Sequence, residues 1–299
     1  MTAGAWAELL RVSALFTVPG DALAGAAAAG RRPDRSTALA VGASLCLYEA
    51  GMALNDWADR EEDAVDRPHR PIPSGRITPR AALTAAGALT AAGLALAARA
   101  GRPALGVATG LAATVWAYDL RLKHTPAGPA AMAAARGLDL LLGATATAAG
   151  QAAPRAAARA AVPAALLGAH TYAVTTVSRH ETQGGSTTAP LAALAAVAGI
   201  GGAVVREGHT SRGTARGAPA RLLVTALTGA YVRTTARPLA HAALNPSPPL
   251  TQRAVGSGIR AMIPLQAALA ARAGAAGTGL AVMGLVPLAR ALSRKVSPT

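Results

Sequence analysis

The chain has 299 residues, of which 52% are hydrophobic and only 14% are charged, and its mean hydropathy is +0.33. Soluble globular domains usually carry about a quarter charged residues, so this composition favours a membrane protein. The net charge of +15 comes almost wholly from Arg residues scattered between apolar segments, which disfavours a nucleic-acid partner and fits loops beside anionic lipid headgroups. Because Cys46 is the only cysteine, no disulfide can form within the chain, and we expect no disulfide-linked partner.

Apolar segments recur along the whole chain. They lie at roughly 9–29, 37–54, 81–98, 103–119, 129–150, 160–177, 188–205, 219–236 and 259–292. Most approach the roughly 20 residues that span the hydrocarbon core, and Gly274 and Gly277 leave the last as one long span or two short ones. Backbone groups in lipid need internal partners and no segment alternates like a barrel strand, so we predict an all-α fold. Residues 1–299 should form one polytopic bundle of about nine transmembrane helices, in which small side chains allow close packing.

The segment after the second apolar block reads NDWADREEDAVDRPHRPIPSGRITP, from Asn55 to Pro79, and contains six of the fourteen acidic residues within its first twelve positions. Asp56, Asp59 and Asp63 are spaced i, i+3 and i+7, so a continuing helix would present all three on one face, with Asn55 at its edge. Mg²⁺ prefers oxygen ligands and is usually shared between one or two carboxylates and a substrate phosphate. The spacing predicts a magnesium site.

A stiff basic loop follows these carboxylates. It contains Pro68, Pro71 and Pro73 and presents Arg67, Arg70 and Arg76. Guanidinium groups bind phosphate oxygens with two parallel hydrogen bonds, so carboxylates for a metal beside these groups indicate a diphosphate site. The alternative is a solvated acidic helix end paired with Arg residues. An EF-hand is excluded because its central Gly and terminal Glu are missing.

This stretch resembles the first aspartate-rich motif, NDxxDxxxD followed by xxRPxRPxPSG, of the UbiA superfamily of intramembrane prenyltransferases. The resemblance implies nine transmembrane helices around a central cavity. It also implies Mg²⁺-dependent transfer of a prenyl group from an isoprenyl diphosphate to a lipophilic or aromatic acceptor. On this resemblance Asn55, Asp56, Asp59 and Asp63 match the metal and diphosphate positions, and Arg67 and Arg70 match the basic residues of the loop.

A second segment, YDLRLKHTPAGP, occupies residues 118–129 and resembles the family sequence after the fourth span. The resemblance implies that Lys123 helps to hold the leaving diphosphate and that Tyr118 offers its ring face to a developing allylic cation. Without the family, an interfacial Lys and an aromatic-belt Tyr are the simpler readings. Arg136 lies inside the next apolar block, where an ionisable group usually faces a cavity or a partner, so we consider it a substrate-binding candidate with Asp139 as its expected partner.

A third segment, at residues 178–186, departs from the family. Most members carry DxxxD after the sixth span, but this stretch has no aspartate, and Glu181 is its only carboxylate beside Arg179 and His180. Fewer carboxylates should weaken a second Mg²⁺ site, and Arg179 or His180 could replace the charge of that metal at the phosphate. His180 is also a candidate general base, although a lone His in a basic loop is often only surface. The pattern looks most like the EboC-type branch, whose members accompany gene clusters for exported secondary metabolites.

The three segments at 55–80, 118–129 and 178–186 follow the second, fourth and sixth spans, so we expect them on one side of the membrane. Arg and Lys are nearly balanced between the two sides and do not orient the chain. We expect a multi-pass protein of the cell membrane with these loops in the cytoplasm. The leading alternative to an enzyme is a non-catalytic carrier or scaffold for a lipid-linked precursor. An ion-coupled transporter would show paired halves, but the Asp motif has no internal repeat.

Overall fold

The computed structural model describes residues 3–148, 152–210 and 217–287. Within these ranges the chain is helical and has no β-strand, which confirms the all-α prediction. The helices are α1 (Ala3–Leu9), α2 (Pro19–Ala28), α3 (Arg35–Ala58), α4 (Arg60–Asp66), α5 (Pro79–Ala100), α6 (Arg102–Ala117), α7 (Gly128–Ala146), α8 (Ala152–Ser178), α9 (Thr188–Thr210), α10 (Ala218–Leu244), α11 (Pro248–Arg272) and α12 (Ala276–Met283). A 3₁₀ helix, η1 (Val12–Thr17), precedes α2, and a π-helical turn, η2 (Tyr118–Leu122), follows α6.

Local signals explain where several helices begin. The Asp34 side chain accepts a hydrogen bond from the Thr37 N–H at 2.9 Å, and the Thr37 hydroxyl completes a reciprocal cap at the start of α3. Thr78 caps α5, whose first residue is Pro79, a residue that suits the first turn because it has no N–H to satisfy. Gly101, with φ 138°, forms the tight connection between α5 and α6. This short connection makes α5 and α6 neighbours.

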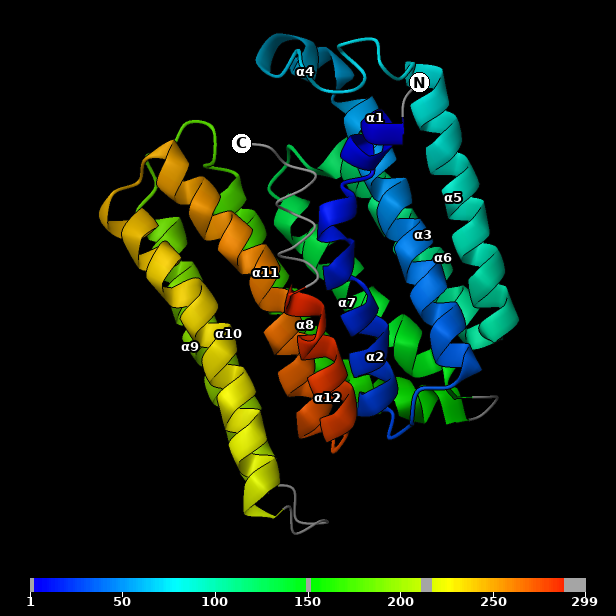
Figure 1. The fold of residues 1–299 in the computed structure, drawn as a ribbon, viewed down its shortest axis with the longest axis vertical. Helices are drawn as coiled ribbons and strands as arrows, with labels where there is room; N and C mark the ends of the chain where they lie inside the picture. The colour runs from blue at the N-terminus through cyan, green and yellow to red at the C-terminus, as the bar shows by residue number, and fades with distance from the viewer. Residues whose placement is uncertain (1–2, 149–151, 211–216, 288–299) are drawn as a thin grey trace.

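The short helix α2 lies at the centre of the bundle. It contacts α3, α7, α8, α11 and α12, whereas α5 lies at one edge and the α9–α10 pair at the other, as Figure 1 shows. The loops that follow α3, α6, α8 and α10 gather at the end of the bundle that carries α4. The three charged segments of the sequence therefore share one end.

Glycine allows α2 and α7 to pack backbone against backbone. A Cβ atom at Gly25 would lie 2.0 Å from the carbonyl oxygen of Leu140, and one at Gly143 would lie 2.2 Å from that of Ala22. Such distances are shorter than any real contact, so only glycine fits at either position. This is the close packing of small residues expected in a membrane bundle.

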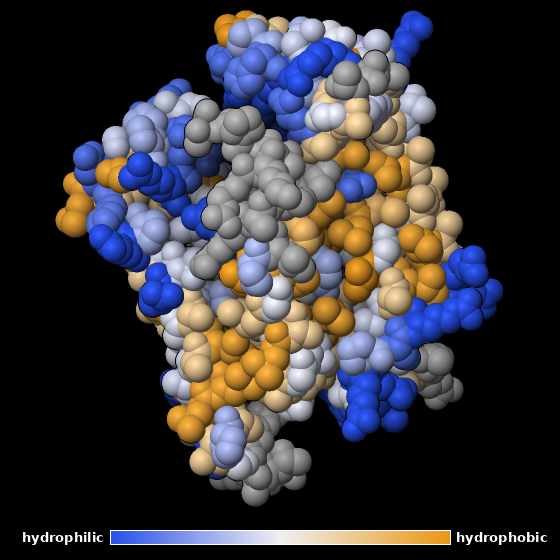
Figure 2. Space-filling model, viewed as in Figure 1, coloured by the Kyte–Doolittle hydropathy of each residue, from blue (hydrophilic) through white to orange (hydrophobic). Residues whose placement is uncertain are grey.

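Five helices are long and apolar enough to cross a membrane. They are α3, α5, α8, the part of α9 from Thr188 to Arg206, and α11. Figure 2 shows apolar side chains along the flank of the bundle in view and hydrophilic ones gathered around α4 and the neighbouring loops. Each of the nine apolar blocks contains helix, but the first is divided between η1 and α2, and the last is divided at Gly274 between α11 and α12. Nine membrane crossings therefore stay a prediction.

Candidate active site

The first acidic motif lies on an almost continuous helix. Only Asp59 separates α3 from α4, and its N–H donates to the carbonyl of Asn55 at 2.9 Å, while the N–H of Asp63 donates to the carbonyl of Asp59 at 2.8 Å. The helix therefore continues past the end of the second apolar block, which is the condition on which the expected shared face depends. Asp56 and Asp63 are buried, whereas Asp59 is half-buried.

Arg70 joins two of the three carboxylates. Its Nη1 atom lies 2.8 Å from Oδ2 of Asp63 and 3.4 Å from Oδ1 of Asp56. Nη1 of Arg67 lies 3.6 Å from the other oxygen of Asp63, and Nη2 of Arg11 lies 3.3 Å from Oδ1 of Asp56. The Pro-rich loop thus returns its basic side chains to the acidic helix face. Arg11 was not predicted as part of this group, although an Arg inside the first apolar block was a signal.

The third carboxylate faces the segment between α6 and α7. The ammonium group of Lys123 contacts Oδ1 of Asp59, and Nε2 of His124 lies 3.9 Å from the same oxygen. The Lys123 side chain is only 10% exposed, so little water screens its charge from Asp59. Two predicted site residues, 64 positions apart in the sequence, are thereby brought together.

Asn55 contacts Asp119, a carboxylate that was not predicted from the sequence. Its amide nitrogen donates to Oδ1 of Asp119 at 3.1 Å, and Asp119 lies buried in η2, beyond the end of α6. Its position beside Tyr118, at the end of an apolar block, was the available signal.

The third segment reaches the same end of the bundle. Nη1 of Arg179 donates to the carbonyl of Thr125 at 3.1 Å and so ties this segment to the loop that carries Lys123. Burial raises the pKa of the Glu181 carboxyl, while the positive charges of Arg67 and Arg11 lower it. Glu181 therefore lies within the electrostatic reach of the first motif.

Tyr118 and His180 occupy different positions at this end. Tyr118 lines a cavity together with Asn55 and Arg11. His180 is half-buried in the turn after α8, where its backbone N–H donates to the carbonyl of Val177 at 3.0 Å. Tyr118 is thus placed where a substrate could meet its ring, whereas general-base action by His180 stays a prediction.

Arg136 lies apart from the charged cluster, deeper in the bundle. Its Nη1 atom donates to Asp21 of α2, so the expected pairing with Asp139 is not the one that the structure contains. The close approach of α2 and α7 at Gly25 and Gly143 brings Asp21 within reach, whereas Asp139 accepts a hydrogen bond from a different helix.

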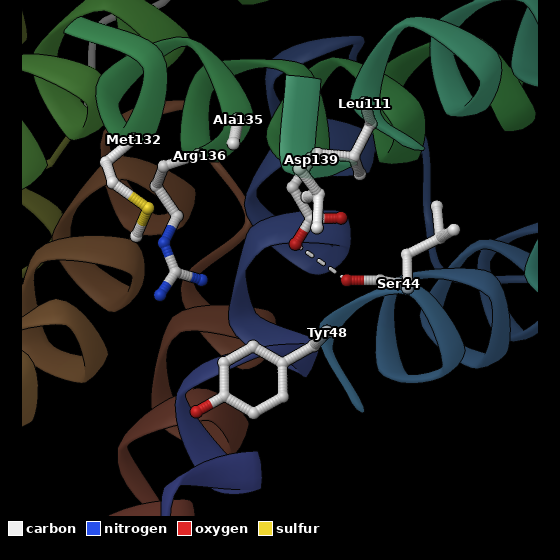
Figure 3. Close-up of a pocket in the computed structure, with 9 residues that line it drawn as sticks. Ser44, Tyr48, Leu111, Met132, Ala135, Arg136 and Asp139 are labelled. Carbon is white, nitrogen blue, oxygen red and sulfur yellow. Dashed lines mark hydrogen bonds between the residues drawn. The ribbon is translucent and has the colours of Figure 1, made fainter. Parts of the chain in front are cut away.

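An elongated cavity leads inward from the charged end. Its outer part, of about 200 Å³, has Arg11, Asn55, Tyr118 and Asp119 among its lining residues, and most of the others are apolar. An inner pocket of about 80 Å³, drawn in Figure 3, lies between α3, α6 and α7. The two parts share lining residues of all three helices, Tyr48 of α3 among them, so they adjoin.

The donor atoms at the charged end fit a hard divalent cation. Three carboxylates follow one another along the α3–α4 helix, and oxygen is the ligand that Mg²⁺ prefers. Asp59, Glu62 and His124 each offer one ligand atom, and these atoms lie within 4.8 Å of one another. Glu62 and His124 were not among the predicted ligands, whereas Asp56 and Asp63, which were, are not part of this group. A metal at Asp59 would therefore have further donors beside it.

Comparison with known proteins agrees with this architecture. Over 127 residues, 41% of the chain, the sequence is 37% identical to the digeranylgeranylglyceryl phosphate synthase of Methanopyrus kandleri. The match covers 45% of that relative, and the chain spans about half or less of the length of the curated relatives that it matches.

Two solved structures share the fold. The apo structure of a UbiA homologue from Aeropyrum pernix K1 has a TM-score of 0.69 at 19% identity, over 91% of this chain and 98% of that one. A UbiA homologue from Archaeoglobus fulgidus bound to GPP and Mg²⁺ has a TM-score of 0.65 at 15% identity, over 94% and 99% of the two chains. The model of the UbiA prenyltransferase family matches residues 14–206, more than half of the sequence. The chain therefore belongs to the UbiA prenyltransferase family.

Proposed function

We propose that this multi-pass membrane protein transfers a prenyl group from an isoprenyl diphosphate to a lipophilic or aromatic acceptor within the bilayer. One observation carries the proposal: charged groups from three distant segments are linked to one another at the end of the bundle where Arg11, Asn55 and Asp119 line a largely apolar cavity. Asp59 contacts Lys123, Arg70 joins Asp56 to Asp63, and Arg179 is anchored to the Lys123 loop.

The basic side chains would bind the diphosphate. Lys123 lies beside Asp59, and Arg67 and Arg70 lie beside Asp63, so basic groups of two different segments could contact phosphate oxygens bound near these carboxylates. Asp56, Asp59 and Asp63 would hold Mg²⁺, which when bound neutralises charge on the departing diphosphate. Because these groups are fixed before the reaction, they stabilise the leaving group without reorganisation.

The cavity would bind the prenyl chain and the acceptor. The bond between the first prenyl carbon and the diphosphate oxygen breaks, a bond from that carbon to the acceptor forms, and the acceptor loses a proton. The ring face of Tyr118 can stabilise positive charge on the allylic carbon, and the apolar walls keep out water that would otherwise capture it.

The related proteins support the same chemistry. The similar proteins from archaea are named digeranylgeranylglyceryl phosphate synthases, and two of the structural neighbours hold GPP or DMAPP together with Mg²⁺. We extend Mg²⁺, an isoprenyl diphosphate and a lipophilic acceptor to this chain on that basis. Membership of the EboC-type branch, the cell membrane and a cytoplasmic charged end remain part of the proposal.

A non-catalytic carrier for a lipid-linked precursor is the second candidate. The third segment favours it, because Glu181 is the only carboxylate where most relatives have two aspartates. The complete first motif opposes it.

Turnover separates the two functions. Purified protein in lipid nanodiscs receives Mg²⁺, geranyl, farnesyl or geranylgeranyl diphosphate and a panel of phenolic acceptors, and released diphosphate is measured. We expect release by the unmodified chain and by Glu61→Gln, an exposed neighbour of the motif, and none by Asp59→Asn. Diphosphate binding without release in any combination would favour the carrier.

A further inference from the structure

A buried polar cluster lies at the inner end of the cavity. It consists of Asp21 of α2, Ser44 of α3, Arg136 and Asp139 of α7, and Gln266 of α11. Asp21, Ser44, Asp139 and Gln266 are all buried, the first and last completely. Ionisable groups at this depth of a membrane bundle are costly and usually serve a function.

Asp21 is fully paired within this cluster. Arg136 Nη1 donates to Oδ2 of Asp21, and Oδ1 of Asp21 accepts from Nε2 of Gln266 at 2.7 Å. The same nitrogen of Gln266 lies 2.7 Å from the carbonyl of Thr17, and Nη2 of Arg136 lies 2.9 Å from the sulfur of Met262. Both oxygens of Asp21 are occupied, and its charge is matched by the guanidinium.

Two oxygens of the cluster have no hydrogen-bond partner among the described residues, Oε1 of Gln266 and Oδ1 of Asp139, and of these two residues Asp139 lines the inner pocket. Its Oδ2 accepts a hydrogen bond from Oγ of Ser44 at 2.6 Å, but among the described residues Oδ1 has no hydrogen-bond partner although it is buried. Asp139 and Ser44 both line the inner pocket, and Figure 3 shows them meeting from α7 and α3, with Tyr48 and Arg136 on the other side of the space. A buried acceptor without a partner costs free energy that a bound donor would recover.

The charges of the cluster indicate which kind of ligand fits. One guanidinium stands against two carboxyl groups, and Asp21 already pairs with that guanidinium. No positive charge is left over to receive an anion. The free oxygen of Asp139 can instead accept a hydrogen bond from an uncharged donor.

We propose that the inner pocket binds a hydroxyl group of the acceptor, which donates to Oδ1 of Asp139, and that it rejects acceptors with a carboxylate at this end. This inference rests on the proposed prenyl transfer, since it names the chemistry of the molecule that shares the cavity with the diphosphate. Asp139 is then a specificity-determining residue.

The position of the pocket adds a requirement on length. Ser44 and Asn55 are eleven residues apart on α3, which corresponds to ~16 Å along the helix axis at 1.5 Å per residue. An acceptor that is held at Asp139 must therefore extend through the outer part of the cavity for its reacting atom to approach Tyr118 and Asn55. The acceptor is an elongated, lipophilic molecule with a hydroxyl group remote from the reacting atom.

Binding of matched probes tests the inference without turnover. Purified protein in lipid nanodiscs is titrated with 4-hexylphenol, its methyl ether 4-hexylanisole, and 4-hexylbenzoate, and empty nanodiscs correct for partition into lipid. The unmodified chain should bind the phenol about tenfold or more tightly than the ether, because the ether has no hydrogen to donate to the unpaired oxygen, and should bind the benzoate most weakly, because no positive charge is left over to pair with its carboxylate. Asp139→Leu should reduce the preference for the phenol over the ether to about onefold.

Two further variants complete the test. Thr145→Val removes a buried hydroxyl that bonds only to carbonyls of its own helix, α7, and should leave the preference unchanged. If Asp139→Leu does not fold, Asp139→Ala serves in its place, and it should likewise reduce the preference for the phenol over the ether to about onefold because it also removes the acceptor oxygen. Equal affinities of the unmodified chain for phenol and ether, or an unchanged preference in the Asp139 variants, would overturn the inference. Binding of a farnesyl thiolodiphosphate to the same samples reports separately on the proposed function.

Discussion

The first and third charged segments lie at the same end of the bundle but differ in the number of carboxylates that they contribute. Residues 55–80 contribute three carboxylates whose charges are balanced by Arg70, Arg67, Arg11 and Lys123. Residues 178–186 contribute one carboxylate, Glu181, within the field of Arg67 and Arg11, and one guanidinium, Arg179, that is anchored to a loop carbonyl. The first segment thus offers several carboxylates, whereas the third offers one carboxylate beside positive charge.

This difference changes how a diphosphate would be held. A second hard cation needs several anionic oxygens, which the third segment does not offer. Guanidinium groups can bind phosphate directly and supply similar electrostatic stabilisation. We therefore expect one Mg²⁺ on the first segment and direct contacts from basic side chains elsewhere.

The largest expected effect is the loss of diphosphate binding in Asp59→Asn. Asp59 lies between the other two carboxylates in sequence and faces Lys123. Mutation of an outer-shell partner typically costs 10–100-fold in metal affinity, so loss of a direct ligand should weaken Mg²⁺-dependent binding of farnesyl thiolodiphosphate by about 100-fold or more. Isothermal titration in nanodiscs measures this, with Glu61→Gln as the matched control. Near-normal binding by Asp59→Asn would remove the first segment from the site.

Glu181→Gln should have a smaller effect in the same titration. It removes one negative charge, and we expect a loss of about 1.5 kcal/mol, the lower end for a charge-assisted contact, or about tenfold in affinity. The positive charges of Arg67 and Arg11 act on Glu181, so some weakening is expected. A loss as large as that of Asp59→Asn would show that the two segments are equivalent and would break the comparison.

Arg70→Met tests whether the guanidinium of Arg70 pairs with the same two carboxylates that a bound Mg²⁺ would bridge. Removing it leaves Asp56 and Asp63 without their shared partner, which we expect to destabilise the protein by about 2 kcal/mol. This is less than the 3–5 kcal/mol of a fully buried pair because the Arg70 side chain is 20% exposed. Mg²⁺ should raise the melting temperature of this variant more than that of the unmodified chain, because the ion can bridge the same carboxylates. An equal rise of the melting temperature with Mg²⁺ in both proteins would contradict the assignment of Asp56 and Asp63 as carboxylates that the ion bridges.

Gly143→Ala tests how much the close packing of α2 against α7 contributes to stability. A Cβ atom there would meet the backbone of Ala22 at 2.2 Å, so we expect a loss of about 1–2 kcal/mol from overpacking between α2 and α7. Gly87→Ala in α5 meets nothing within 4 Å and should be neutral or stabilising. Melting temperatures in nanodiscs provide the measurement. Equal melting temperatures for the two variants would show that the close approach of α2 and α7 does not limit stability.

The charged end of the molecule was largely predictable because its signals are local. The spacing of Asp56, Asp59 and Asp63 and the Pro-rich loop that follows identify a helix face and a returning basic segment. The alternation of apolar blocks with three charged segments also predicts that these segments share one end. Asp119 was not predicted as a site residue because it is identified by its hydrogen bond with Asn55, which is far away in sequence and close only in the fold.

The polar contacts of the interior were not predictable because their partners lie far apart in the sequence. Arg136 pairs with Asp21 across 115 positions, and Gln266 reaches Asp21 across 245, so neither partner is visible in a local pattern. Asp139, one turn from Arg136, was the nearest carboxylate in sequence and the wrong partner. The division of the first apolar block follows from Pro19, which begins α2 and separates it from η1.

The number of magnesium ions bound with the diphosphate tests the central claim most directly. Mg²⁺ is titrated into the unmodified chain and into Glu181→Gln, both in nanodiscs and saturated with farnesyl thiolodiphosphate, and the stoichiometry is read by calorimetry. If the first segment alone supplies the metal ligands, both proteins should bind one Mg²⁺. A stoichiometry of two in the unmodified chain that falls to one in Glu181→Gln would contradict this account and restore an ordinary two-metal site.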